Sequence, residues 1–314
     1  MSAALYPDQI LRMHAADFTS DLDLLDDEVE KLLELAAEMK RTPTRYAQAL
    51  PGKSIALLFE KPSLRTRLTF ELAIRQLGGD AVAVDGPVNG REPLKDVARN
   101  LDRWVNGIVA RTFSQTTVED LARWSAVPVI NALSDRYHPC QALADLLTIR
   151  EAFGEERGRT LAFTGDGNNV AHSLMLTACR LGMNVRVATP PEYAPCAEIV
   201  ERAQAAARAN GAELLLTASP EEAVRGADVV YTDVWASMGQ EAEAETRRRH
   251  FRPYQVTAAL LKQAAPGAIF LHCLPAHRGE EVTDEVIESA QSRVFDQAEN
   301  RLHTQKALLL MLLG

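Results

Sequence analysis

Short apolar segments alternate with helical segments along this chain, and the alternation restricts the folds that the chain can adopt. Apolar segments of this length, each followed by an amphipathic helix, are typical of parallel strands joined by helical crossovers. The expected strands are residues 54–59, 81–84, 107–112 and 127–130, followed by 160–164, 184–188, 213–216, 228–232, 268–271 and 294–295. The sequence therefore predicts an α/β protein with two doubly wound, Rossmann-like parallel-sheet domains, one for each series.

The boundary between the two predicted domains falls on or just after the helix that begins at Pro139. We expect one domain over residues 1–150 and the other over residues 151–298. Residues 299–314 contain an apolar helix that is too hydrophobic to stand alone, so we expect it to pack back on the first domain. Doubly wound domains bind ligands at the carboxyl ends of their strands. The two domains are therefore expected to face an interdomain cleft that holds the site.

The composition restricts the partners and the location of the protein. Its 314 residues carry a formal net charge of −9, which argues against nucleic-acid and membrane-surface binding because both require a basic face. No apolar run approaches the ~20 residues that a membrane span needs, and the N-terminus shows no secretory signal. The four cysteines have no CxxC spacing, so neither a zinc site nor a redox pair is indicated. We expect a cytoplasmic protein without a metal or another cofactor.

An anion site is predicted where the first strand meets its helix. Residues 60–67 read Glu-Lys-Pro-Ser-Leu-Arg-Thr-Arg and precede a helix expected over residues 68–77. The N–H groups at a helix N-terminus attract anions. Two hydroxyls and two guanidiniums add to these donors, from Ser63, Thr66, Arg65 and Arg67. The segment predicts a phosphate or acyl-phosphate site, and a solvated basic helix start is the alternative.

Polar side chains also follow the ends of other predicted strands. In the first domain these are Arg111, His138 and Gln141, and in the second they are Asn168, Asn169, Asp233, Ser237 and Cys273. Since ligands bind at the carboxyl ends of such strands, these residues are expected to converge. His138 beside Arg111 would stabilise negative charge on a carbonyl oxygen, although a lone histidine is more often structural. Asp233 and Ser237 suit an ammonium group, with a helix N-cap as the alternative.

Residues 165–169, Gly-Asp-Gly-Asn-Asn, are similar to part of a dinucleotide-binding fingerprint. That fingerprint needs a third glycine and an acidic residue at the end of the following strand. Val170 stands in place of the third glycine, and residues 186–190 contain no acid. A nicotinamide-dependent dehydrogenase is therefore disfavoured, and the asparagines suit a carboxylate ligand better. A direct dyad of Cys273 with His272 is also disfavoured, since neighbours in a strand point to opposite faces.

At these residues the chain is similar to the carbamoyltransferase family, over roughly residues 18–313. Residues 63–67 resemble the family's S-T-R-T-R motif for carbamoyl phosphate and residues 138–141 match H-P-x-Q, and aspartate and ornithine carbamoyltransferases share both motifs. Residues 237–239 and 272–275 resemble the S-M-G and H-C-L-P signatures of the ornithine branch. The resemblance implies carbamoyl transfer from carbamoyl phosphate to the δ-amine of L-ornithine, giving L-citrulline and phosphate. Putrescine or an N-acylated ornithine is the alternative acceptor.

The resemblance also implies a role for each matching residue. Carbamoyl phosphate is expected to bind Ser63, Leu64, Arg65, Thr66, Arg111, His138, Gln141, Cys273, Leu274 and Arg301. L-Ornithine is expected to bind Asn169, Asp233, Ser237 and Met238. The expected catalytic residues are Arg65, Arg111, His138, Asp233 and Cys273, of which the last two would aid deprotonation of the δ-amine. The family is metal-free, forms homotrimers or multiples of trimers, and acts in arginine biosynthesis or breakdown.

Two residues depart from the family's pattern. Leu64 replaces a threonine, which removes a hydroxyl but retains the backbone donor. Pro87 stands where family members often carry a glutamine that reaches the carbamoyl phosphate of a neighbouring subunit. Proline lacks that amide, and the sequence leaves open whether Asn89 or Arg91 replaces it.

Overall fold

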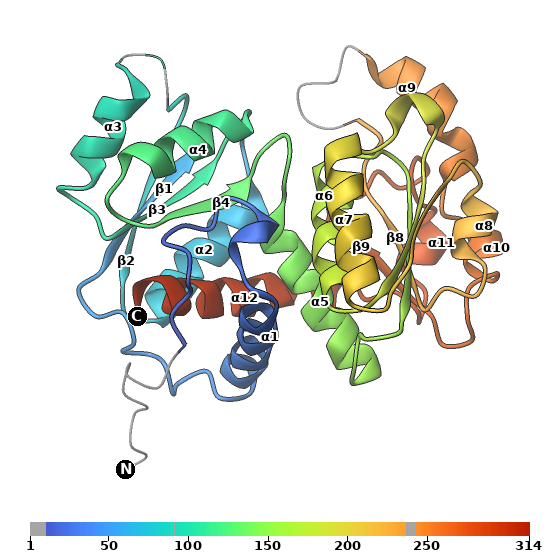
Figure 1. The fold of residues 1–314 in the computed structure, drawn as a ribbon, viewed down its shortest axis with the longest axis horizontal. Helices are drawn as coiled ribbons and strands as arrows, with labels where there is room; N and C mark the ends of the chain where they lie inside the picture. The colour runs from blue at the N-terminus through green and yellow to red at the C-terminus, as the bar shows by residue number, and fades with distance from the viewer. Residues whose placement is uncertain (1–10, 89, 91, 237–242) are drawn as a thin grey trace. The chain divides into compact units, whose positions relative to one another are not determined.

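The computed structural model of the chain describes residues 11–88, 90, 92–236 and 243–314. These residues form two compact α/β units (Figure 1). The first unit contains the residues up to Leu147 together with Glu299–Gly314, and the second contains Thr148–Ala298. Each unit holds a parallel sheet with helices on both faces, so the predicted fold class is confirmed. Among the described residues, no helix has the length and apolar content to cross a membrane.

The sheet of the first unit has the strand order β2-β1-β3-β4, with all strands parallel. Its strands are β1 (Ser54–Phe59), β2 (Asp80–Asp85), β3 (Gly107–Arg111) and β4 (Val129–Leu133). Two helices cover one face, α3 (Leu94–Leu101) and α4 (Gln115–Trp124) (Figure 1). They pack on side chains of β1 and β3 such as Leu58 and Ile108. The apolar run of β1 is almost entirely buried, as expected of an interior parallel strand.

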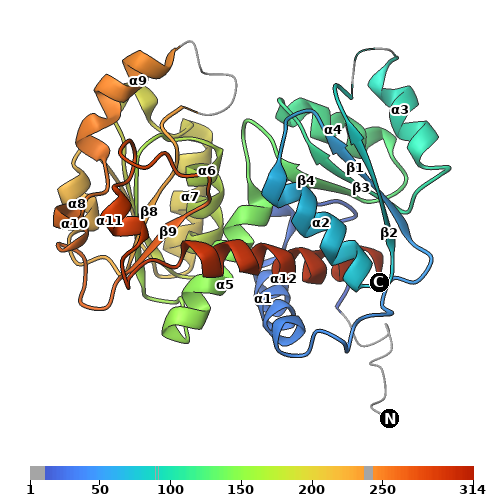
Figure 2. The ribbon, with the colours of Figure 1, turned by 180° about the vertical axis from the view of Figure 1, so that it is seen from behind.

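Three helices lie on the opposite side of this sheet, α1 (Asp26–Arg41), α2 (Leu64–Gln76) and α12 (Val294–Leu313) (Figure 2). Backbone and side-chain hydrogen bonds hold the C-terminal helix there. Met13 N donates to the Met311 carbonyl (3.1 Å), and Lys306 Nζ donates to Gln76 Oε1 of α2 (3.2 Å). The predicted packing of the C-terminal helix on the first unit is therefore confirmed. A short 3-10 helix precedes α1 (Asp21–Asp23), and α5 leads from the first unit into the second (Pro139–Phe153).

The sheet of the second unit has the order β7-β6-β5-β8-β9 and is parallel as well. Its strands are β5 (Thr160–Thr164), β6 (Asn184–Ala188), β7 (Leu214–Thr217), β8 (Val229–Thr232) and β9 (Ile269–His272). One face carries α6 (Asn169–Arg180) and α7 (Ala197–Ala209), and the other carries α8 (Pro220–Val224), α10 (Ala258–Leu261) and α11 (Asp284–Ile287). The remaining elements are α9 (Ala244–Phe251) and two 3-10 helices, Pro191–Tyr193 and Arg252–Tyr254. Val230 and Phe270 lie in the core under α8, α10 and α11.

The structure corrects two expectations about element boundaries. The helix expected from residue 68 begins at Leu64, so the anion-binding segment is the first turn of a helix rather than a separate loop. Residues 294–295, expected as a strand, begin α12 instead. Pairing with β9 ends before them, because Phe270 N donates to the Gln291 carbonyl and Arg293 N donates to the Phe270 carbonyl.

The strand order of each sheet reverses at one place, and this place determines where ligands bind. In the first unit the chain passes from β1 to β2 on one side and to β3 and β4 on the other. In the second unit it passes from β5 to β6 and β7 on one side and to β8 and β9 on the other. Segments that follow strands at such a switch point diverge and leave a crevice at the carboxyl end of the sheet. The segments after β1, β3, β5 and β8 are therefore the candidates for a functional site.

Candidate active site

The segment after β1 forms a helix N-terminus without a side-chain cap. Ser63 occupies the N-cap position in an extended conformation, but its side chain makes no capping hydrogen bond. The first-turn N–H groups of α2 are therefore not satisfied by this hydroxyl and suit a ligand. Arg65 and the buried Thr66 lie in this turn, and Leu64 is 70% exposed. The turn thus has the donors that an anion site needs.

Two buried arginines meet the hydroxyl of Thr66. Arg111, at the end of β3, donates from Nη1 to Thr66 Oγ1 (3.4 Å), and Arg301 of α12 donates from Nη2 to the same oxygen (3.2 Å). Arg301 also donates from Nη1 to Gln141 Oε1 (2.6 Å), and Gln141 Nε2 donates to Asp145 Oδ1 (2.8 Å). The network of these five buried side chains holds two guanidiniums and one carboxylate. An anionic ligand would balance its excess positive charge.

His138 precedes α5 and lies in the same buried region. Burial, with the positive charges of Arg301 and Arg111 nearby, lowers the pKa of its imidazole well below the ordinary value. The ring is therefore neutral at physiological pH and adds no further positive charge. A neutral imidazole still donates one hydrogen bond, which suits a carbonyl oxygen on which negative charge develops.

The sequence predicts Arg67 as a donor to the anion, but in the structure this side chain binds two carboxylates. Its Nε donates to Glu71 Oε1 (3.0 Å), and its Nη1 donates to Asp85 Oδ2 (2.6 Å). Two carboxylates thus engage this guanidinium on the surface of the first unit. Arg67 therefore contributes to the surface of the first unit rather than to the anion site.

Glu60 has a structural role at this site that the sequence did not reveal. Its carboxylate accepts hydrogen bonds from Val88 N (3.2 Å) and from Phe113 N (2.9 Å). These bonds tie the segments after β2 and β3 to the end of β1. The partners lie 28 and 53 positions away along the chain, so no local pattern marks the contact.

In the second unit, the two asparagines after β5 have different places. Asn168 is the N-cap of α6, where its Oδ1 accepts from Val170 N (3.0 Å) and Ala171 N (3.2 Å). Its Nδ2 donates to Asp233 Oδ2 (2.8 Å), so Asn168 holds both a helix and a carboxylate. Asn169 is the first residue of α6 and is partly exposed, which suits contact with a ligand.

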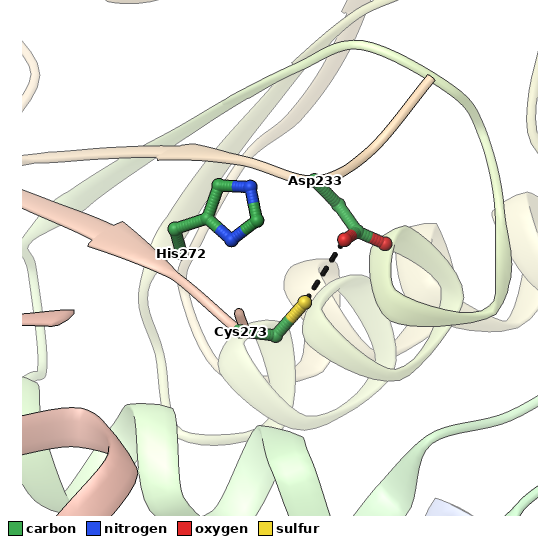
Figure 3. A group of neighbouring side chains, drawn as sticks. All are labelled: Asp233, His272 and Cys273. Atoms are coloured by element: carbon green, nitrogen blue, oxygen red, sulfur yellow. Dashed lines mark hydrogen bonds between the residues drawn. The ribbon is translucent and has the colours of Figure 1, made fainter. Parts of the chain in front are cut away.

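Asp233 and Cys273 form a hydrogen-bonded pair just beyond β8 and β9 (Figure 3). Cys273 Sγ donates to Asp233 Oδ1 at 2.9 Å, and the same oxygen accepts from Val234 N at 2.8 Å. Asp233 is buried, whereas Cys273 is partly exposed. The pair provides a carboxylate and a thiol at one place, for holding an ammonium group or for accepting a proton.

His272 supports the turn that follows β9. The side chain is fully buried, its Nε2 lies 3.1 Å from Glu281 Oε1, and its Nδ1 accepts from Leu274 N (2.8 Å). The backbone bond makes Nδ1 the acceptor, so Nε2 carries the hydrogen and donates a hydrogen bond to Glu281. Leu274 has a left-handed φ of 56°, and the bond from Leu274 to Pro275 is cis.

Donor atoms of Asp233, His272 and Cys273 lie within 4.8 Å of one another, close enough to surround a metal ion. Hydrogen bonds already engage them, since the thiol donates to Asp233 while the imidazole binds Glu281 and Leu274. The three groups therefore satisfy one another and their neighbours through hydrogen bonds.

These residues form two half-sites, one in each unit. The cationic half-site of the first unit consists of Ser63, Leu64, Arg65, Thr66, Arg111, His138, Gln141 and Arg301. The acidic half-site of the second unit consists of Asn168, Asn169, Asp233, Cys273 and Leu274. Four further residues named from the sequence lie outside the described part of the chain, namely Ser237, Met238, Asn89 and Arg91.

Both halves of the chain match domains of the same known protein family. Residues 16–151 match the carbamoyl-P binding domain of aspartate/ornithine carbamoyltransferases, and residues 157–312 match their Asp/Orn binding domain. The chain is 52% identical to ornithine carbamoyltransferase of Nostoc punctiforme over 95% of its length and 97% of that protein. It is 53% identical to the enzyme of the same name from Carboxydothermus hydrogenoformans, over 95% and 97% of the two chains. The structure of ornithine carbamoyltransferase from Pyrococcus furiosus superposes with a TM-score of 0.93 at 48% identity, over 97% and 98% of the chains.

Proposed function

This chain belongs to the aspartate/ornithine carbamoyltransferase family, and we propose that it transfers the carbamoyl group of carbamoyl phosphate to the δ-amine of L-ornithine. The products are L-citrulline and phosphate. The observation that carries the proposal is the arrangement of Arg111 and Arg301 around Thr66 at an uncapped helix N-terminus. Such an arrangement suits a substrate that carries both a phosphate group and a polarised carbonyl group.

The cationic half-site is proposed to bind carbamoyl phosphate. The phosphate group occupies the first turn of α2, where Ser63, Leu64, Arg65 and Thr66 supply backbone and side-chain donors. Arg111, His138 and Arg301 are proposed to bind the carbonyl oxygen and the adjoining phosphate oxygens. The carbamoyl amide is proposed to donate to Gln141 and to the backbone of Cys273 and Leu274.

The proposed chemistry needs little covalent catalysis, because phosphate is a good leaving group. The lone pair of the neutral δ-amine forms the new C–N bond, the C–O bond to phosphate breaks, and one proton leaves the nitrogen. Positioning of the two substrates contributes on the order of 7–11 kcal/mol to such a step, and one well-placed donor to the developing charge roughly 3–4 kcal/mol. The δ-amine has a lysine-like pKa of ~10, so a proton acceptor is needed. The pair of Asp233 and Cys273 is proposed to provide it.

The acidic half-site is proposed to select ornithine among the possible acceptors. Asn169 binds the α-carboxylate, and Asp233 binds the α-ammonium group together with Ser237 and the backbone of Met238. Putrescine has no α-carboxylate for Asn169, and an N-acylated ornithine has no α-ammonium charge for Asp233. A buried carboxylate at this position therefore favours the unmodified amino acid.

We propose in addition that the protein is a homotrimer or a multiple of trimers. The outer face of α2 carries leucines at positions 64, 68 and 72, which are 70%, 47% and 45% exposed. The neighbouring β2 is an edge strand with Val82 52% and Val84 50% exposed. Such an apolar patch beside an open sheet edge is typical of a surface that another chain covers. Leu68→Glu should lower the mass measured by light scattering, and an unchanged mass would contradict this assignment of the face.

A cytoplasmic location is proposed as well, because all four cysteines are free thiols and reducing compartments keep thiols unpaired.

A colorimetric ureido assay tests the proposed reaction directly. The protein is incubated with carbamoyl phosphate and, in separate reactions, with ornithine, aspartate, putrescine or N-acetylornithine. Product should form with ornithine and not with the other three amines. Faster turnover of putrescine or N-acetylornithine would overturn the assigned acceptor, and product from none of the four would overturn the transferase activity.

A further inference from the structure

A buried ion pair in the second unit takes no part in the proposed reaction. Asp166 lies in the turn after β5 and Arg247 lies on α9, and their side chains are 9% and 5% exposed. Arg247 donates from Nη1 (3.3 Å) and from Nη2 (3.2 Å) to the same oxygen, Asp166 Oδ2. Because the desolvation of two charges often outweighs their attraction, a buried pair is weak evidence of a contribution to stability. The place of this pair, next to the acidic half-site, points to another role.

Arg247 fixes α9 to its surroundings through further contacts. Its guanidinium lies over the ring of Tyr193, 4.6 Å from the centroid, and over Phe251 at 5.6 Å. Its Nε lies 3.7 Å from the carboxylate of Glu243. Cation–π contacts are strongest where the cation is desolvated, as it is here. Arg247 therefore joins α9 to the turn that carries Asp166.

The turn itself has little freedom to move. A Cβ at Gly167 would lie 2.6 Å from the Tyr193 carbonyl oxygen, and Gly167 N donates to that oxygen (2.9 Å). The Asp166 carbonyl accepts from Asn168 N (2.7 Å), and Asn168 Nδ2 donates to Asp233 Oδ2 (2.8 Å). A displacement of Asp166 is therefore passed through Asn168 to the carboxylate of Asp233.

We propose that Asp166 and Arg247 are positioning residues for the amino-acid substrate, whose ion pair holds the turn after β5 and orients Asp233 through Asn168. This inference rests on the proposed function, because it takes Asp233 as the partner of the α-ammonium group. Both residues act through others and contact no reacting atom. Loss of the pair weakens binding of the acceptor and leaves the binding of carbamoyl phosphate unchanged.

The pair also makes binding of the acceptor depend on pH. The charged groups that face Asp166 are Arg247 of α9, Asp233 after β8 and Glu243 before α9. Burial raises the pKa of Asp166 to about 7, Arg247 opposes this shift, and Asp233 and Glu243 add to it. Below that pH the carboxyl group is protonated and its ionic bond to Arg247 is lost, whereas above it the pair forms. Affinity for the acceptor should therefore rise as the pH increases through about 7.

Asp166→Asn and Arg247→Met test the pair in the citrulline assay. Each should raise the KM for ornithine roughly ten- to a hundredfold, as expected when a binding group is misplaced, with the KM for carbamoyl phosphate unchanged. Arg249→Met changes an exposed arginine of the same helix and is the matched control, with wild-type kinetics expected. The double variant should be no worse than the worse single variant, because the same bond is lost in all of them.

A pH profile separates positioning from a general loss of stability. L-Norvaline has the carbon chain of ornithine without the δ-amine, so it carries no group that titrates near neutral pH. Its inhibition constant against ornithine is measured from about pH 6 to about pH 8.5, with carbamoyl phosphate saturating. The wild-type protein should bind it more tightly above about pH 7, whereas Asp166→Asn should give a flat profile at the weaker level.

The outcomes distinguish this inference from the proposed function. If the wild-type protein forms no citrulline from ornithine, the proposed function is wrong. If it forms citrulline but both single variants have the KM of Arg249→Met, only the positioning role is wrong. A flat wild-type norvaline profile also overturns the inference, and this measurement decides even where a variant does not fold.

Discussion

The two half-sites have opposite electrostatics, and the difference matches the charges of their proposed ligands. The cationic half-site holds the buried Arg111 and Arg301 beside a histidine that burial keeps neutral. The acidic half-site is centred on the buried Asp233, which lies close enough to Asp166 to help raise the pKa of that second carboxyl group. Charge complementarity lets each half-site discriminate between an anionic and a cationic substrate. Removing one charge should therefore affect one substrate and spare the other.

The half-sites differ also in what supports them. The first is built on a backbone feature, the N-terminus of α2, and keeps some anion affinity whatever the side chains are. The second is built on a chain of side-chain bonds, in which Asp233 is held by Asn168 and Cys273. We expect kcat to be most sensitive to the guanidiniums of the first and the KM for ornithine to be most sensitive to the carboxylate of the second.

The largest expected effect is that of Arg65→Ala. Arg65 lies in the first turn of α2, and its removal should lower kcat by about 10²–10³-fold, as expected for the loss of one donor to developing charge. Steady-state citrulline formation with both substrates saturating measures the loss. Arg67→Ala removes an arginine from the same turn, but Glu71 and Asp85 already engage that guanidinium, so its loss should be much smaller. Equal losses in the two variants would refute the assignment of Arg65 to the phosphate.

Asp233→Asn should have the second largest effect, on the other substrate. The loss of a charge-assisted hydrogen bond costs about 1.5–3 kcal/mol, which corresponds to a rise of roughly ten- to a hundredfold in the KM for ornithine. The KM for carbamoyl phosphate should change little. Asp284→Asn, at an aspartate of the same unit whose side chain is 69% exposed, serves as the control. A comparable rise in both KM values would show that the two half-sites are not separable by charge.

The pH dependence of the unfolding free energy reports the protonation state of His138 in the cationic half-site. Its folded-state pKa lies well below the ordinary value of 6.5, so only the unfolded chain takes up a proton as the pH falls below 6.5. The contribution of the neutral ring to stability is present above that pH and declines below it, by about 1.4 kcal/mol per pH unit. His138→Gln is neutral at every pH and should show a shallower decline of the unfolding free energy in urea between about pH 7 and pH 5. Parallel curves for the two proteins would show that folding does not lower the pKa of His138.

The fold class and the centre of the cationic half-site could be predicted from the sequence because both are local. Residues 63–66 lie a few positions after a buried strand, and a helix N-terminus supplies donors by its geometry. The start of α2 at Leu64 was missed, since the first turn is polar and lacks the apolar periodicity that marks a helix. The strand expected at residues 294–295 was wrong for the opposite reason, because two apolar residues are compatible with either element.

The supports of the acidic half-site could not be predicted, since they join distant residues. Asn168 and Asp233 are 65 positions apart, and Asp166 and Arg247 are 81 positions apart. Asp166 looked like a remnant of a dinucleotide fingerprint, and Arg247 is one of three successive arginines on α9. Arg247 differs from the other two arginines because it is buried. The rings of Tyr193 and Phe251, which the fold brings next to it, contribute to this burial.

The smallest expected effect concerns the dependence of the cationic half-site on a second copy of the chain. Pro87 lies after β2, beside the residue whose N–H donates to Glu60, at the position where family members often carry a glutamine. Pro87→Gln should lower the KM for carbamoyl phosphate by about two- to tenfold, the equivalent of one hydrogen bond of ~0.5–1.5 kcal/mol. Pro87→Ala removes the ring without adding an amide, and it should bring no gain. A gain limited to the glutamine variant is expected if the segment after β2 reaches the carbamoyl phosphate of a neighbouring copy, and identical kinetics of the two variants would argue that another residue makes this contact.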